Sequence, residues 1–233
     1  HGRDLQVDKA TLIGAGSDPI AASYRQVSPD GIVRIDLAET VAAQTAQLDV
    51  TYHGRVNDTF NGLFRVSVGG DWYAFTQFEA TDARAVFPSF DEPRFKTPFT
   101  LSVVAPRADA VVANTPAAEV IELPDGTKRV RFEPTAMLPT YLVALAVGPF
   151  DIVDGPPLVA GSLRVPVRGI AVKGRGSAFD RALADTPDLV ARLADYFAMP
   201  YPFAKLDLVA VPAQEGAMEN AGLITYGEYA MLL

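Results

Sequence analysis

An apolar run followed by a small-residue turn, near the end of the chain, places the strongest constraint on the fold. The run Leu206–Val211 has the length of a β-strand and is stopped by Pro212. Gly216–Asn220 then bring a glycine, a carboxylate and an amide together. A glycine beside a small residue lets another backbone approach, as when a peptide adds to a sheet edge, and Glu219 would supply a negative charge there. A plain turn has a similar composition, so both interpretations stay open.

Composition excludes several classes of protein. The 233 residues suit one large or two modest domains, and 49% hydrophobic against 21% charged residues is typical of a globular protein. The net charge is −8 and the basic residues are scattered, so we expect no nucleic-acid partner. No stretch approaches the about 18 apolar residues of a membrane span. The absence of cysteine excludes disulfides and thiolate metal sites, which fits a reducing bacterial cytoplasm and leaves the periplasm open as an alternative.

The first 150 residues or so show the pattern of many short β-strands. Turn signals recur every 8–12 residues, which predicts a sandwich or a saddle-shaped sheet assembly. The expected features are a turn at 29–31 before a strand at 32–37, a half-buried strand at 48–52, hairpins 63–68/72–76 and 120–123/129–132, and central strands at 99–105 and 141–147.

The pattern changes after Phe150. Asp154–Pro157 has the composition of a linker, and one or two strands are expected between Leu163 and Val172. Helical spacing then runs over 177–198, interrupted by Pro187, which predicts two abutting helices or one kinked helix. Seven apolar residues share its expected buried face: Phe179, Ala182, Leu183, Val190, Leu193, Ala194 and Phe197. The strand 206–211 then returns to a sheet.

Histidine is scarce, and this limits the chemistry. The chain has only His1 and His53, so it lacks the H-E-x-x-H pair of a zinc hydrolase. It also lacks the G-x-S-x-G elbow of a serine hydrolase. We therefore expect neither a catalytic residue nor a bound metal within these residues.

Two segments in the first half could bind a ligand. Gln77 and Glu79 end an expected strand and lie two residues apart, so their side chains share one face. An amide and a carboxylate together can hold an ammonium group, with a charged hydrogen bond contributing about 1.5–3 kcal/mol; a solvated strand face is the alternative. In the segment 82–96, we favour a structural pairing of Arg84 with Asp91 or Glu92 over ligand binding by those acids.

Five blocks, in order, resemble the M1 family of zinc aminopeptidases, the gluzincins with a GAMEN motif. They are 76–79, 82–93, 139–144, 200–207 and Gly216–Asn220. The resemblance implies a mainly β fold with two parts. A saddle-shaped or sandwich-like N-terminal β domain (1–152), without its first strands, would precede the α+β beginning of a thermolysin-like catalytic domain (153–233), which ends before the zinc motif. The opening at His1 rather than Met agrees with a segment of a longer, bacterial-type protein.

The resemblance also implies roles for single residues. Glu219 matches the glutamate that binds the free α-amino group of a peptide, and Glu79 matches a residue that assists it. Gln77 matches a residue of the pocket for the first side chain. Gly216 and Ala217 match the backbone beside the peptide, and Met218 and Asn220 complete that substrate-binding segment.

Two positions depart from the familiar family pattern. Ala221 stands where many relatives carry tryptophan, and Glu215 stands where a small or apolar residue is usual. Glu215 leads to the hypothesis that a basic first residue is preferred.

The implied activity is removal of N-terminal residues from peptides with a free amino terminus, using zinc in the full-length protein. Without the zinc motif, these 233 residues alone are expected to be inactive. The alternatives are a non-catalytic M1-like scaffold, an M1 relative with added epoxide-hydrolase activity, and a plain β-sandwich binding module.

Overall fold

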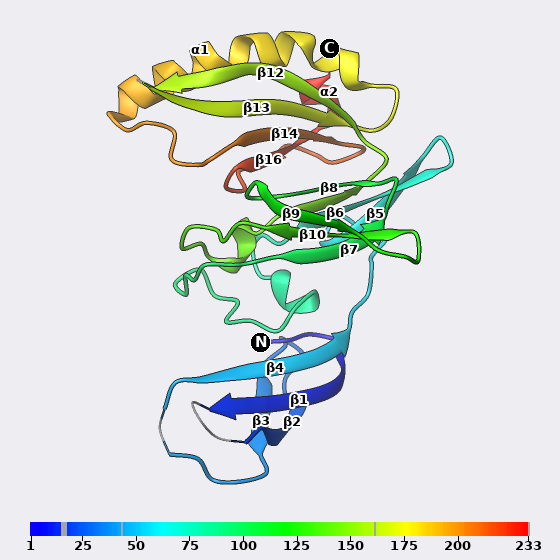
Figure 1. The fold of residues 1–233 in the computed structure, drawn as a ribbon, viewed down its shortest axis with the longest axis vertical. Helices are drawn as coiled ribbons and strands as arrows, with labels where there is room; N and C mark the ends of the chain where they lie inside the picture. Colours follow the sequence, from blue (N-terminus) through cyan, green and yellow to red (C-terminus); the bar gives the residue numbers. More distant parts are fainter. Residues whose placement is uncertain (15–17, 43, 161, 233) are drawn as a thin grey trace.

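In the computed structural model, which describes residues 1–14, 18–42, 44–160 and 162–232, four sheets and one long helix are stacked along the molecule. Figure 1 shows the N-terminal sheet at one end, two sheets in the middle, and the C-terminal sheet covered by helix α1 at the other end. The expectation of a mainly β chain with a sandwich-like N-terminal part is confirmed.

The N-terminal sheet has the strand order β3-β2-β1-β4. Its strands are β1 (Gln6–Gly14), β2 (Ile20–Gln26), β3 (Val33–Leu37) and β4 (Ala46–His53). The predicted turn before β3 is present, with Gly31 at φ 84°, a conformation that favours glycine. On β4, Val50 and Tyr52 are half-buried as expected, but Leu48 is exposed. This sheet therefore buries little apolar surface of its own.

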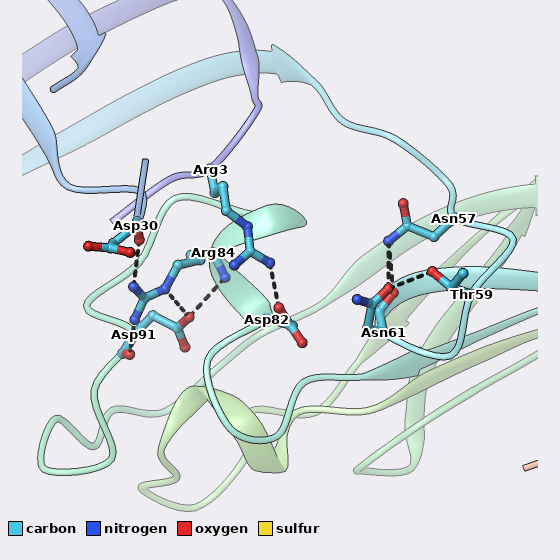
Figure 2. A network of polar contacts seen from close by, with 8 residues as sticks. All are labelled: Arg3, Asp30, Asn57, Thr59, Asn61, Asp82, Arg84 and Asp91. Carbon is cyan, nitrogen blue, oxygen red and sulfur yellow. Dashed lines mark hydrogen bonds and ion pairs between the residues drawn. The ribbon is translucent and has the colours of Figure 1, made fainter. Parts of the chain in front are cut away.

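A buried ion pair joins that sheet to the middle of the molecule (Figure 2). Arg84 Nε lies 2.9 Å from Asp91 Oδ2, and Asp91 is fully buried. Arg84 also donates through Nη1 to the carbonyl of Asp30, at 2.7 Å, and Arg3 pairs with Asp82 beside it. The predicted pairing of Arg84 with Asp91 is confirmed, and its partners indicate a structural role.

Two sheets pack face to face in the middle. One contains β5 (Gly62–Val68), β6 (Asp71–Gln77), β11 (Leu145–Gly148) and β8 (Ala110–Ala113), in that spatial order. The other contains β7 (Ser102–Pro106), β10 (Thr127–Phe132) and β9 (Ala117–Glu122). Ala113, Val130 and Phe132 fill the space between them. Both predicted hairpins, β5–β6 and β9–β10, are present.

The two long apolar runs do not become the central strands that we expected. Within 99–105, strand β7 begins only at Ser102 and lies at the edge of its sheet, so that prediction is wrong. Within 141–147, a 3-10 turn covers Thr140–Leu142, and only the short β11 is a central strand. Phe99 and Tyr141 instead pack on a cluster around Phe78. The apolar composition of the two runs correctly indicated that they pack on the core, but a segment without regular secondary structure can pack there as well as a strand can.

The C-terminal sheet has the order β12-β13-β14-β16-β15. Its strands are β12 (Asp151–Ala160), β13 (Leu163–Ala171), β14 (Leu206–Val211), β15 (Ala217–Met218) and β16 (Leu223–Gly227). β13, β14 and β16 are parallel, and β15 pairs antiparallel at the edge. The predicted strand 206–211 is present as β14, which lies at the centre of the sheet with every residue buried.

The expected linker at 154–157 is wrong. These residues lie inside β12, an edge strand whose register shifts between Gly155 and Leu158. Pro156 and Pro157 occupy this irregularity, where no ladder hydrogen bond from a proline nitrogen is required. β12 begins at Asp151, two residues before the expected domain boundary.

Helix α1 (Asp180–Phe197) is one continuous helix after a 3-10 turn at Gly176–Phe179, and the short α2 covers Glu228–Met231. Pro187 lies inside α1, and Thr186 donates its hydroxyl to the carbonyl of Ala182 at 2.6 Å instead of capping a second helix. Phe179 and Leu183 pack on the sheet, but Leu193 and Phe197 are exposed, contrary to the expected face.

Candidate functional site

The core between the middle and C-terminal sheets brings two distant parts of the chain together. Phe64, Tyr73 and Phe75 of the middle sheet pack with Ile170, Val209 and Leu223 of the C-terminal sheet, and all six are at most 1% exposed. Because this packing spans the two sheets, the end of β6 and the segment after β14 lie side by side. A cavity has formed where they meet.

Four of the predicted site residues line this cavity, whose volume is about 460 Å³. Gln77 and Glu79 come from one side, and Glu215 and Ala217 come from the other. Phe60, Phe64, Ala213 and Gln214 complete the lining. The structure thus unites residues that sequence reasoning could connect only through a family resemblance.

The end of β6 sets the orientation of Gln77 and Glu79. Phe78, between them, is 3% exposed and packs on its own core cluster, so its neighbours point the other way. Glu79 is exposed, whereas Gln77 is half-buried. The Oε1 atom of Gln77 is buried and accepts no hydrogen bond from the described residues. A buried acceptor without a partner is costly, and a ligand that donates to it would remove that cost.

On the other side of the cavity, Gly216 directly precedes the edge strand β15. Its φ of 70° is in the left-handed region, and the space where a side chain would project is open. Its N–H donates to the Tyr229 hydroxyl at 3.0 Å, and its carbonyl accepts from the N–H of Gly227 at 2.9 Å. β15 pairs with β16 on one side only. Its other edge has no neighbouring strand among the described residues, and an extended peptide could add to the sheet there.

The remaining site residues lie beside the cavity and do not line it. Met218 and Asn220 are 2% and 3% exposed, so their side chains face the interior. Glu219, between them, is exposed, on the same side as Ala217 because side chains alternate along an extended segment. Met218 pairs with Thr225 of β16. Glu219 therefore presents a carboxylate from a backbone whose two flanking residues are anchored.

The charge of the cavity has one sign. Its lining includes the carboxylates Glu79 and Glu215 and no lysine, arginine or histidine. Such a lining favours a cation and disfavours an anion.

The described residues do not fit a metal site. Within the described ranges, no group of three or more His, Cys, Asp or Glu side chains is arranged to hold a metal ion. His53 is exposed on β4, and its Nδ1 atom lies 3.0 Å from Asp8 Oδ2.

No helix in the described ranges has the length and hydrophobicity to cross a membrane.

Sequence reasoning missed Gln214, which lines the cavity, and Asn114, a polar residue beside the site. Asn114 follows β8, is 4% exposed, and donates to the carbonyl of Ala221, just beyond Asn220. It lies more than 100 positions from that partner, and no local pattern distinguishes it from a surface asparagine. Only the packing of the two sheets reveals the contact.

Fold and cavity together define a mainly β protein with an acidic cavity between its middle and C-terminal sheets. Residues 1–142 match the model of the peptidase M1 N-terminal domain, and residues 181–233 match that of the peptidase family M1 domain. The chain belongs to the M1 peptidase family, as the resemblance in its sequence indicated.

Several relatives cover almost the whole chain. It is 36% identical to aminopeptidase M1-B of Oryza sativa subsp. japonica, over 99% of this chain and 27% of that protein. It is 31% identical to human endoplasmic reticulum aminopeptidase 1, over 100% of this chain and 25% of that protein. Aminopeptidase N of Acetobacter pasteurianus is 33% identical, over 98% of this chain and 66% of that protein. The chain thus spans about a quarter of the first two relatives.

Proposed function

We propose that this chain carries the amino-terminus recognition site of a zinc aminopeptidase that removes N-terminal residues from peptides. The observation that supports this most is the shared cavity of Gln77, Glu79, Glu215 and Ala217, beside the edge strand that leads to Glu219. The names of the relatives agree with an aminopeptidase. Division of the chain into an N-terminal β domain (1–152) and the beginning of a catalytic domain (153–233) is part of this proposal.

In the proposed complex, the peptide lies along β15 and its first residue enters the cavity. Glu219 and Glu79 bind the free ammonium group. A carboxylate gains a charge-assisted hydrogen bond from an ammonium, about twice as strong as one from a neutral amide. Two carboxylates at this place therefore select the end of a chain and exclude internal peptide bonds, whose nitrogen is neutral. Gly216 and Ala217 form the backbone segment beside the peptide: the N–H and carbonyl of Gly216 are held by Tyr229 and Gly227, and its missing side chain leaves room for the peptide. Met218 and Asn220 support this segment from the interior.

Glu215 gives the cavity a second role. With Glu79 committed to the ammonium group, Glu215 and the unpartnered Oε1 of Gln77 remain as acceptors on the wall of the cavity. A first residue with a lysine or arginine side chain would donate to both. We propose that basic first residues are preferred for this reason.

Zinc would be held by other parts of the full-length protein, because the described residues here provide no cluster of ligands. When bound there, the metal would polarise the water that attacks the first peptide bond. The contribution of this chain is to bind and orient the peptide. By itself it is expected to lack hydrolytic activity.

The experiment compares free and N-acetylated aminoacyl arylamides as substrates of the full-length protein. A leucyl or lysyl arylamide should be hydrolysed, its N-acetylated form should not, and chelation of zinc should abolish the reaction. A non-catalytic scaffold, the second candidate, would bind the free amine without hydrolysing either form. Equal hydrolysis of free and acetylated substrates would contradict amino-terminus recognition.

A further inference from the structure

A buried turn follows directly after Glu219. Leu223 N–H donates to the Asn220 carbonyl at 3.1 Å, and Gly222 within the turn has a φ of 70°. Asn220, Ala221 and Leu223 are at most 5% exposed. The residues of this turn are not among those that line the cavity, but the turn fixes the backbone directly after Glu219.

One side chain reaches this turn from the N-terminal part of the molecule. Asn114 Nδ2 donates to the carbonyl of Ala221 at 2.9 Å and to that of Leu142 at 2.8 Å, while Oδ1 accepts from the N–H of Ala144 at 2.8 Å. The Asn114 amide thus bonds on both sides of the junction. The approach is close, since a Cβ atom on Gly222 would lie 2.3 Å from the Asn114 carbonyl oxygen.

A second side chain holds the turn from the C-terminal sheet. Lys205 Nζ donates to the carbonyl of Gly222 at 2.8 Å and to Asp207 Oδ2 at 2.7 Å. The same carbonyl accepts from the N–H of Asp207 at 3.1 Å. Lys205 is 4% exposed and Asp207 is fully buried. Consecutive carbonyls of one turn are therefore bound by side chains from the two parts of the chain.

We infer that Asn114 and Lys205 are positioning residues, which hold the Asn220–Leu223 turn and thereby place the carboxylate of Glu219 for a ligand ammonium group. Met218 anchors the other side of Glu219 through its pairing with Thr225. With both flanks held, Glu219 is oriented before the ligand arrives, and little freedom is lost on binding. The inference rests on the proposed role of Glu219. It adds that the orientation depends on a contact between the two parts of the molecule.

The test uses the full-length protein and an aminoacyl arylamide, with KM, kcat and thermal unfolding measured for each variant. Asn114→Asp replaces the donor Nδ2 by an oxygen that faces the carbonyls of Leu142 and Ala221. Lys205→Met removes the ammonium group and keeps a side chain of similar volume. Each should raise KM by about tenfold and change kcat by less than about twofold. Lys205→Arg should recover part of the loss. Thr115→Val is the control, because its hydroxyl donates to the Glu133 carbonyl, at 2.6 Å, on the same side of the junction.

A double-mutant cycle with Glu219→Gln separates positioning from general destabilisation. If Asn114 acts through Glu219, Asn114→Asp should change KM by less than about twofold in the Glu219→Gln background. An undiminished tenfold effect in both backgrounds, or a loss of kcat with KM unchanged, would overturn the inference. Should Glu219→Gln itself leave KM unchanged, the proposed function fails instead. If Asn114→Asp does not fold, Asn114→Ser takes its place in the cycle and is judged by the same criteria, because a neutral hydroxyl repels the carbonyls less than a carboxylate does.

Discussion

Asp207 Oδ2 lies 2.7 Å from both Lys205 Nζ and Arg168 Nη2, at a fully buried position of the central strand β14. Arg168, directly across on β13, makes its second bond to Oδ1 at 2.8 Å. One buried carboxylate thus faces two cations. Arginine keeps its charge at any accessible pH, whereas a buried lysine can lose its proton.

Lys205 should make stability depend on pH in the alkaline range. Burial lowers the pKa of Lys205 from 10.5 to about 8, against the opposing effect of Asp207. Between these values the unfolded state binds more protons, so the contribution of this group to the free energy of unfolding rises with pH; below pH 8 both states are protonated. The difference in free energy of unfolding between the wild type and Lys205→Met should therefore increase by about 2 kcal/mol from pH 8 to pH 10, in favour of the wild type. Denaturant unfolding at both pH values measures it, and a constant difference would contradict the lowered pKa.

The Arg84–Asp91 pair should contribute strongly to stability. Asp91→Asn keeps the volume but leaves the Arg84 guanidinium, whose side chain is 9% exposed, without its charge partner. Breaking a buried pair in this way should cost about 3–5 kcal/mol. The control is Glu92→Gln, which removes an exposed partner of Arg94 and should cost at most about 1 kcal/mol. Chemical denaturation of both variants provides the comparison, and equal costs would argue against a structural role.

Glu219→Ala in the full-length protein should raise KM and lower kcat/KM by about two orders of magnitude or more, because one charged contact to a desolvated ammonium is lost, worth about 3 kcal/mol. Steady-state kinetics on an aminoacyl arylamide measures this. Glu39→Ala, at an exposed position of the N-terminal part, is the matched control and should leave both constants unchanged. An effect of Glu219→Ala below about fivefold would remove Glu219 from the site.

Glu215→Ala should reduce the preference for a basic first residue. With the second carboxylate of the cavity gone, kcat/KM for a lysyl substrate should fall about tenfold relative to that for a leucyl substrate. Glu215→Asp, which keeps the charge, should retain most of the preference. If wild type and Glu215→Ala protein turn over both substrates in the same ratio, Glu215 does not read the side chain.

Much of the fold could be predicted because local patterns carry it. The hairpin around Gly69 and Gly70 and the buried strand Leu206–Val211 are signalled by turn residues and apolar runs, and both are present. The errors occur where local pattern and long-range packing disagree. Pro187 predicted two abutting helices or one kinked helix; Phe179, Leu183 and Val190 pack on the sheet on both sides of it, and one helix continues through the proline. The pair Pro156 and Pro157 suggested a linker but occupies a bulge in an edge strand.

By itself, the sequence determined the family, two hairpins, the buried strand Leu206–Val211 and which residues to examine for amino-terminus recognition, because motif and periodicity are local properties. Tertiary structure alone decided that Gln77 and Glu79 share a cavity with Glu215, that Met218 and Asn220 face inward, and that Asn114 holds the turn beyond Glu219. Each of these contacts depends on the apolar core between the middle and C-terminal sheets. This core brings together residues that are far apart in the sequence: Asn114 and Ala221, for example, are more than 100 positions apart. Contacts across that distance follow from which faces pack together, and residue spacing does not record them.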